Sequence, residues 1–410
     1  MHSRAGNTGQ FAAGQPGWNS RTLGTPVSAG AAPGRAWRQQ VPPTSATAGS
    51  LPMQGNSAPD LVVRPFGGAD SCVMVKSTRI ALLSVVVAVL SILGFVAPSQ
   101  AAPPGRVDPR PSTEKLAREL QELQWRSRGA IQVNAIGESN QGRPVWSARV
   151  GDGPLRILYV TQQHGDEPLG TPAALEFLRD VGVGQSNYQR WLRSQVTVDI
   201  VVRANPDGHE QNWRYNYAPD ATPEYGEAGK GYDINRYHDP AVAPEDNPAT
   251  EAGLIQRHYA QFQPQIVVDY HMQGRYVDGS GREITASLLW PTNQGVAADD
   301  IALAKQISVV AQRSMTEGGA NVSQYPGGDY QGIARNAYGL RGSGSVLIEL
   351  SDMGAEHEQA QIESALRSML AIAHSAADGS LTKVDPAGAD AIPPRGTPLP
   401  QAAASSVHSD

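Results

Sequence analysis

Five short apolar segments constrain the fold of this chain most strongly. They are RILYVTQQ (156–163), VTVDIVV (196–202), QIVVDY (265–270), ASLLW (286–290) and VLIEL (346–350). Segments that are apolar on both faces are typical of interior strands in α/β proteins. Helical patterns alternate with them, at roughly 170–180, 248–262, 299–315 and 355–376. We therefore expect an α/β fold in one domain, with a mixed, mostly parallel, twisted β-sheet and helices on both of its faces.

The composition agrees with a globular protein that has long loops or disordered ends. The chain has 410 residues, of which 40% are hydrophobic and 18% are charged, and it contains 43 Gly and 31 Pro. Its net charge of -6, without any cluster of Lys and Arg, argues against a nucleic-acid partner.

A stretch that begins at Met74 has the organisation of a signal peptide. One lysine and one arginine supply the positive start, residues 80–96 form an apolar core, and the small-x-small pattern SQA precedes Ala102. A transmembrane helix is the alternative, because the apolar run reaches the short end of spanning length. The cleavage pattern favours export, so we expect a secreted, extracellular protein without stable membrane association after cleavage.

We expect the signal peptide to span residues 74–101, with the other segments of the chain on either side of it. Residues 1–73 lack apolar periodicity, and we interpret them as a disordered, misassigned upstream extension. We expect a linker at 102–110, the folded domain at 111–378 and a disordered Pro/Ala-rich tail at 379–410. Cys72, the only cysteine, lies in the extension, so a metal site in the exported chain must use histidines and carboxylates.

Two of the expected strands end in metal-ligand residue types. VVDYHMQGRY (267–276) places His271 at the end of a strand, with Asp269 two positions earlier. The strand 156–163 leads into HGDEPLG, which carries His164 and Glu167. Each motif alone is weak, and capping of a strand end is the simpler interpretation of a lone histidine. Together they supply two His and one Glu, a common catalytic zinc set, where α/β sheets bind ligands.

Three further stretches carry residues with recognisable chemistry. NPDG (205–208) is a good β-turn sequence. GYDINRYH places Asn235 beside Arg236, a pair suited to bind a carboxylate, although a solvated loop would have the same sequence. VLIELSDMG buries Glu349 in an apolar strand, where a carboxylate needs a partner or a function.

In this order the motifs resemble those of the zinc carboxypeptidases related to carboxypeptidase A, the funnelin metallopeptidases. The resemblance begins at IGESNQGRPVWSARVG and continues through HGDE, NPDG, NWRYN, DINR and DYH to VLIELSDMG. It spans essentially the whole expected domain. Each motif is weak alone, but their shared order is specific. The resemblance implies a secreted zinc metallocarboxypeptidase that holds one Zn²⁺ per chain.

The resemblance also implies a role for each residue of the site. The zinc ligands would be His164, Glu167 and His271, and the general base toward the attacking water would be Glu349. Arg214, in NWRYN, would polarise the scissile carbonyl. Asn235 and Arg236 would bind the terminal carboxylate of the substrate, and Asp233 would orient the first zinc histidine.

This chain also departs from the digestive members of that family. Asp166 lies inside the H-x-x-E motif, where many of them have arginine, so the neighbouring subsite should be less cationic. The tyrosine that covers the substrate should lie in SQYPGGDYQG, and we predict Tyr325, with Tyr330 as the competitor. No separate inhibitory pro-domain fits between Ala102 and the catalytic segment.

Three functions are compatible with these residues. The first is a monomeric carboxypeptidase that acts on the C-termini of peptides or proteins. The second is a zinc amidohydrolase of the same superfamily, acting on cell-wall peptides or N-acyl amino acids; NPDG and Arg214 favour the peptidase. The third is an inactive module that binds peptide ends, which the complete ligand set with Glu349 disfavours.

Overall fold

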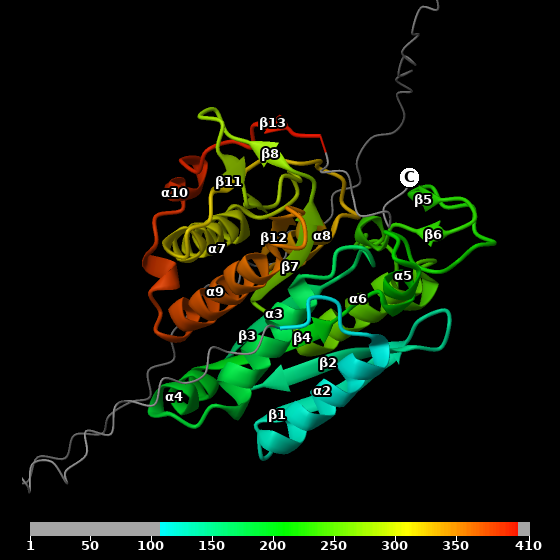
Figure 1. Ribbon diagram of the computed structural model, residues 1–410, viewed down its shortest axis with the longest axis horizontal. Coiled ribbons are helices and arrows are strands. Elements are labelled where there is room, and N and C mark those ends of the chain that lie inside the picture. Colours follow the sequence, from blue (N-terminus) through cyan, green and yellow to red (C-terminus); the bar gives the residue numbers. More distant parts are fainter. Residues whose placement is uncertain (1–106, 401–410) are drawn as a thin grey trace, which may run out of the picture. The chain divides into compact units, whose positions relative to one another are not determined.

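The computed structural model describes residues 107–400 (Figure 1). The predicted upstream extension, the signal peptide and residues 102–106 of the linker lie outside the described residues, as do residues 401–410. Within the described part, no helix has the length and apolar character needed to cross a membrane.

One mixed eight-stranded sheet organises this part of the chain. Its strand order is β1-β2-β4-β3-β7-β12-β10-β11. Parallel pairing joins β3 with β4 and β7, β7 with β12, and β10 with β11, whereas β1/β2, β2/β4 and β10/β12 are antiparallel. The bounds are β1 Ile131–Glu138, β2 Pro144–Val150, β3 Leu155–Thr161, β4 Val196–Val202, β7 Ile266–Gln273, β10 Ala286–Leu289, β11 Val322–Gln324 and β12 Gly344–Ser351.

Helices cover both faces of this sheet because the central strands are apolar on both sides. Along β3, Ile157 and Tyr159 point into one apolar cluster, and Leu158 and Val160 point into another. The first cluster is covered by α2 Thr113–Arg126, α3 Gly170–Phe177, α4 Asn187–Gln195, α7 Ala298–Glu317 and α9 Glu358–Ala377. The second is covered by α6 Thr250–Phe262 and α8 Ala334–Leu340. The expected α/β architecture is confirmed.

Several expected boundaries are wrong in detail. The helix expected at 248–262 begins at Thr250, and Asn247 accepts a hydrogen bond from the backbone N–H of Ala249 just outside it. The helix expected at 170–180 continues as a π-helical turn, Leu178–Val183. His271 is not the last residue of its strand, since β7 continues to Gln273.

The expected disordered tail is also wrong for the part that the structure describes. Residues 379–400 form two short helices, Leu381–Lys383 and α10 Ala387–Asp390, and a short strand, β13 Thr397–Pro398. Leu381 and Ile392 are buried in the first apolar cluster, and β13 pairs with β8 Tyr276–Val277. A few buried apolar side chains therefore anchor a segment whose composition predicts disorder.

Candidate metal centre and its surroundings

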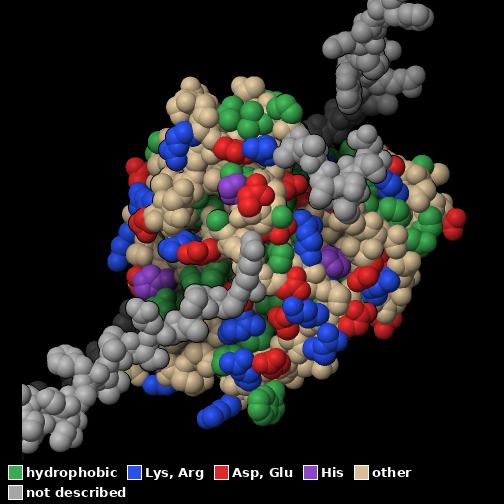
Figure 2. All heavy atoms as spheres, in the orientation of Figure 1, with side chains coloured by type: hydrophobic (Ala, Val, Ile, Leu, Met, Phe, Trp, Pro, Cys, Tyr) green, Lys and Arg blue, Asp and Glu red, His purple; other side chains and the backbone are tan. Residues whose placement is uncertain are grey.

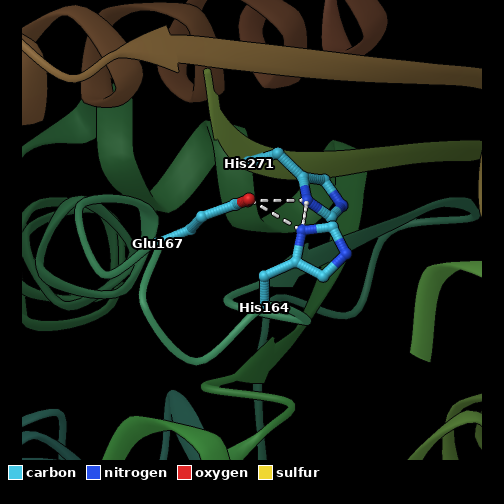
Figure 3. A group of neighbouring side chains, drawn as sticks. All are labelled: His164, Glu167 and His271. Carbon is cyan, nitrogen blue, oxygen red and sulfur yellow. Dashed lines mark hydrogen bonds and ion pairs between the residues drawn. The ribbon is translucent and has the colours of Figure 1, made fainter. Parts of the chain in front are cut away.

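Three ligand-type side chains meet at the carboxyl edge of β3 and β7. His164 and Glu167 lie in the turn that follows β3, and His271 lies on the adjacent parallel strand β7. The two Nδ1 atoms are 3.0 Å apart, and the Glu167 carboxylate lies 2.8 Å from His164 Nδ1 and 2.9 Å from His271 Nδ1. Figure 3 shows the three groups pointing toward one another. One ligand atom from each lies within 4.8 Å of the others, so this trio could hold a metal ion.

The outer nitrogens of the two imidazoles face carboxylates. His164 Nε2 lies 3.0 Å from Asp233 Oδ1, and His271 Nε2 lies 2.8 Å from Asp269 Oδ2. A carboxylate accepts, so each Nε2 can donate to its outer carboxylate; with a cation at the centre, each Nδ1 would then present its lone pair inward beside Glu167. Three acceptors then converge on one point, which favours a cation there. This donor set fits Zn²⁺, and the outer carboxylates fix the tautomers that such binding requires.

Asp233 connects this trio to Arg214. Its Oδ2 accepts from Arg214 Nε at 3.1 Å and from Nη2 at 2.9 Å, while Arg214 Nη1 lies 3.4 Å from Glu167 Oε1. Burial acts to raise the pKa of Asp233, but His164, Arg214 and Arg236 hold it well below its usual range. The carboxylate is therefore ionised, and it fixes the guanidinium beside the trio.

Glu349 lies beside His271 because β12 and β7 are parallel neighbours. The two residues are direct partners in the register of these strands. One carboxylate oxygen accepts from the Tyr325 hydroxyl at 3.1 Å, and the other is buried without a hydrogen-bond partner among the described residues. Burial raises the pKa of Glu349, and the charge of Glu167 acts in the same direction. A carboxylate with a raised pKa near a metal trio is suited to proton transfer.

Asn235 and Arg236 lie in a single 3₁₀ turn, Ile234–Arg236, next to the trio. Asp233 caps this turn by accepting from the backbone N–H of Asn235 at 3.1 Å. The Asn235 side-chain oxygen accepts from the backbone N–H of Ala334, at the start of α8. Arg236 Nη1 donates to the backbone oxygen of Asn235 at 2.9 Å, and its side chain is partly exposed. Asn235 Nδ2 thus lies 3.2 Å from His271 Nε2, and Arg236 Nη1 lies 3.9 Å from Asp233 Oδ2, the carboxylate behind His164.

NPDG and the segment IGESNQGRPVWSARVG, at which the resemblance begins, have structural roles. Asn205 caps α5, Pro206–Gln211, by accepting from the backbone N–H of Gly208. The turn after β3 packs against this cap so closely that a Cβ on Gly165 would lie 2.0 Å from the Gly208 carbonyl carbon. Asp207 accepts from Ser139 and Arg143 of the opening segment, each at 2.8 Å. These contacts fix the turn that carries His164.

The two candidate tyrosines lie in different surroundings. Tyr325 directly follows β11 and reaches Glu349. The Tyr330 ring instead packs against Tyr225, with ring centroids 4.8 Å apart. The geometry therefore favours Tyr325 as the tyrosine of the site, and its assignment as the substrate-covering residue stays a prediction.

A series of buried polar side chains in contact with one another lies behind His271, and the sequence motifs did not assign it a role. Asp269 Oδ2 accepts from Gln163 Nε2 at 2.6 Å, and Gln163 Oε1 lies 2.6 Å from His238 Nε2. His238 Nδ1 lies 3.0 Å from the Tyr338 hydroxyl. The spacing of Asp269 and His271 could have predicted their contact, since residues two apart in a strand point to the same face.

The charge distribution on the drawn face is mixed. Figure 2 shows Lys and Arg side chains interspersed with Asp and Glu, without one continuous basic patch on that face. No field of one sign therefore extends over that face.

Comparisons with known proteins agree with this geometry. Residues 116–278 match a family model described as zinc carboxypeptidase, and this range contains all three residues of the trio. No curated protein gave a match. The structure resembles carboxypeptidase A from Helicoverpa armigera, with a TM-score of 0.51 and 19% identity over 66% of this chain and 74% of that chain.

A second solved structure gives the same result. Bovine thrombin-activatable fibrinolysis inhibitor, in complex with tick carboxypeptidase inhibitor, matches with a TM-score of 0.50 and 16% identity, over 65% of this chain and 97% of that chain. At such identities the likeness shows the fold alone, and this fold is the expected one.

Proposed function

We propose that this chain, whose residues 116–278 match the zinc carboxypeptidase family model, is a secreted enzyme that removes the C-terminal residue from peptides. The family and its zinc dependence agree with the predicted metallopeptidase. The observation that carries the finer proposal is the position of Asn235, Arg236 and Glu349 around the trio of His164, Glu167 and His271.

Each residue around the trio has a chemical role in this proposal. Zinc held by the trio would supply Lewis-acid polarisation of the scissile carbonyl and of the attacking water. Glu349 would accept the proton of that water and return it to the leaving amine, for which its raised pKa is suited. Arg214, held by Asp233, would place positive charge where the oxyanion develops.

Asn235 and Arg236 make the proposed enzyme an exopeptidase. A partly exposed guanidinium beside a buried amide is suited to bind a carboxylate that lies one residue beyond the scissile bond. The chain should therefore require a free C-terminus.

A pair of peptides that differ only at the C-terminus tests this requirement. We expect the zinc-loaded full chain to hydrolyse the free acid at least roughly tenfold faster than the amidated twin. Arg236→Met should reduce this preference, because it removes the charge and keeps much of the side-chain volume. Equal rates on both peptides with the unmodified chain would contradict an exopeptidase and favour the amidohydrolase alternative.

Secretion and a monomeric state are parts of the same proposal. The support for export is the signal-peptide pattern that begins at Met74 and its cleavage site before Ala102. N-terminal sequencing of protein from the culture medium should start near Ala102. Recovery of the uncleaved chain in the membrane fraction would contradict export.

A further inference from the structure

The C-terminal segment after α10, residues 391–400, runs past the edge of the sheet at which the metal trio lies. Its backbone pairs with β11, since Gln324 donates to the Pro393 oxygen at 2.8 Å and Arg395 donates to the Gln324 oxygen at 2.7 Å. It also pairs with β8 through β13, which lies beside β8 in Figure 1. These backbone contacts place residue 395 next to the residue that follows Gln324, namely Tyr325.

The side chain of Arg395 lies between two aromatic rings. Its guanidinium carbon is 3.5 Å from the centroid of the Tyr325 ring and 4.1 Å from that of the Tyr276 ring. Nη1 donates to the side-chain oxygen of Gln273 at 3.0 Å, and Gln273 ends the strand that carries His271. A planar guanidinium stacked on an aromatic face combines cation–π attraction with packing.

The opposite end of the Tyr325 side chain reaches the proposed base. Its hydroxyl donates to Glu349 Oε1 at 3.1 Å. The backbone after Tyr325 is fixed separately, because buried Arg335 donates from Nη2 to the oxygens of Pro326 and Gly328 at 3.1 and 2.7 Å. Pro326, Gly327 and Gly328 are exposed, whereas the Tyr325 side chain is held at its ring face by Arg395 and at its hydroxyl by Glu349.

We propose that Arg395 is a positioning residue that holds Tyr325 over Glu349 before a peptide arrives, so that the C-terminal segment is part of the active site. This inference rests on the proposed function. Arg395 acts through the tyrosine ring and does not itself touch the reacting atoms. Removing its guanidinium should lower the fraction of molecules in which Tyr325 points inward.

The kinetic consequence is a change in KM rather than in kcat. When only a fraction of molecules has the competent conformation, the apparent affinity is multiplied by that fraction, so KM rises. Saturating substrate draws all molecules into the competent conformation, so kcat is retained. A cation–π contact of this kind corresponds to roughly five- to thirtyfold in such an equilibrium. Arg395→Gln should therefore raise KM by up to roughly this factor and change kcat by less than about threefold.

A double-mutant cycle on the zinc-loaded full chain tests whether Arg395 acts through Tyr325. In a Tyr325→Ala background, Arg395→Gln should change kcat/KM by less than about twofold, because the ring that it positions is absent. Arg395→Lys should recover part of the loss, since an ammonium also binds an aromatic face. Arg275→Gln is the matched control, because Arg275 lies near the same segment but pairs with Glu283, and it should leave KM unchanged.

Hydrogen exchange provides a readout that does not depend on catalysis. Amides of residues 324–331 should exchange faster in Arg395→Gln than in the unmodified chain, while amides of β3 and β7 stay protected. An equal loss of kcat/KM with and without Tyr325, or an unchanged KM, would overturn the inference. If the unmodified chain hydrolyses no peptide, the proposed function fails, and unchanged exchange at 324–331 would then still overturn the positioning role.

Discussion

Asp233→Asn should weaken zinc binding and hydrolysis while leaving the fold intact. Asp233 is 6% exposed and uses both carboxylate oxygens, one for His164 Nε2 and one for Arg214. An asparagine has the same shape but only one acceptor atom and no charge. It can keep one of these two partners, and it no longer raises the basicity of the imidazole.

The magnitude follows from these contacts. Loss of a carboxylate behind a zinc histidine typically costs roughly 10- to 100-fold in metal affinity, or about 1.4–2.7 kcal/mol. Because Arg214 loses its ionised partner in either orientation of the asparagine, kcat/KM at saturating zinc should fall by a further factor of roughly ten or more.

Zinc affinity is best measured by competition with a chelator, and hydrolysis with a free-acid peptide at saturating zinc. Asp199→Asn is the matched control, because Asp199 is likewise a buried carboxylate, bonded to Arg149 and Ser147, but on β4. It should lower stability without changing zinc affinity. If folded Asp233→Asn protein binds zinc as tightly as the unmodified chain, the orienting role of Asp233 is wrong.

Three other measurements test the site and its surroundings. Glu349→Gln should lower kcat by roughly a hundred- to ten-thousandfold while zinc stays bound, and near-normal turnover would place the proton acceptor elsewhere. Removing zinc with a chelator should lower the unfolding temperature, because zinc at a hundred times its Kd adds about 2.7 kcal/mol to the free energy of unfolding; an unchanged unfolding temperature would contradict a metal site in the folded chain. Burial raises the pKa of Glu251 to about 7 from 4.5, so its contribution to stability is complete below pH 4.5 and is lost as the pH rises through 7. Glu251→Gln should remove this loss, about 3 kcal/mol between pH 4.5 and 8, in unfolding curves; an equal loss in the variant would assign it to other groups.

The sheet and the metal trio were predictable from sequence because both depend on local patterns. Apolar runs such as 196–202 are short, bounded and suited to interior strands, and they became β4 with the same limits. His164 and His271 were found because each lies at the edge of such a run. Their meeting follows from parallel pairing of β3 with β7, which brings equivalent ends together.

The contribution of the C-terminal segment could not be predicted in this way. Residues 379–400 are rich in Pro, Ala and Gly, and only Leu381, Ala389 and Ile392 bury apolar side chains. Their ordering depends on surfaces of α7 and β11 that exist only in the folded domain. For the same reason, no local pattern connects Arg395 with Tyr325, since 69 residues separate them in the chain and only the folded domain brings them together.

The distribution of the site over three parallel strands has a consequence for folding. The two histidines are 107 residues apart in the chain, and Glu349 adds a third strand, so the site forms only after β3, β7 and β12 have paired in register. Parallel pairings across such separations form slowly, because loop closure must precede the contacts that stabilise them. Zinc therefore cannot act as an early nucleus. During refolding, tight metal binding should appear only after most of the sheet has formed, and its appearance reports a completed domain.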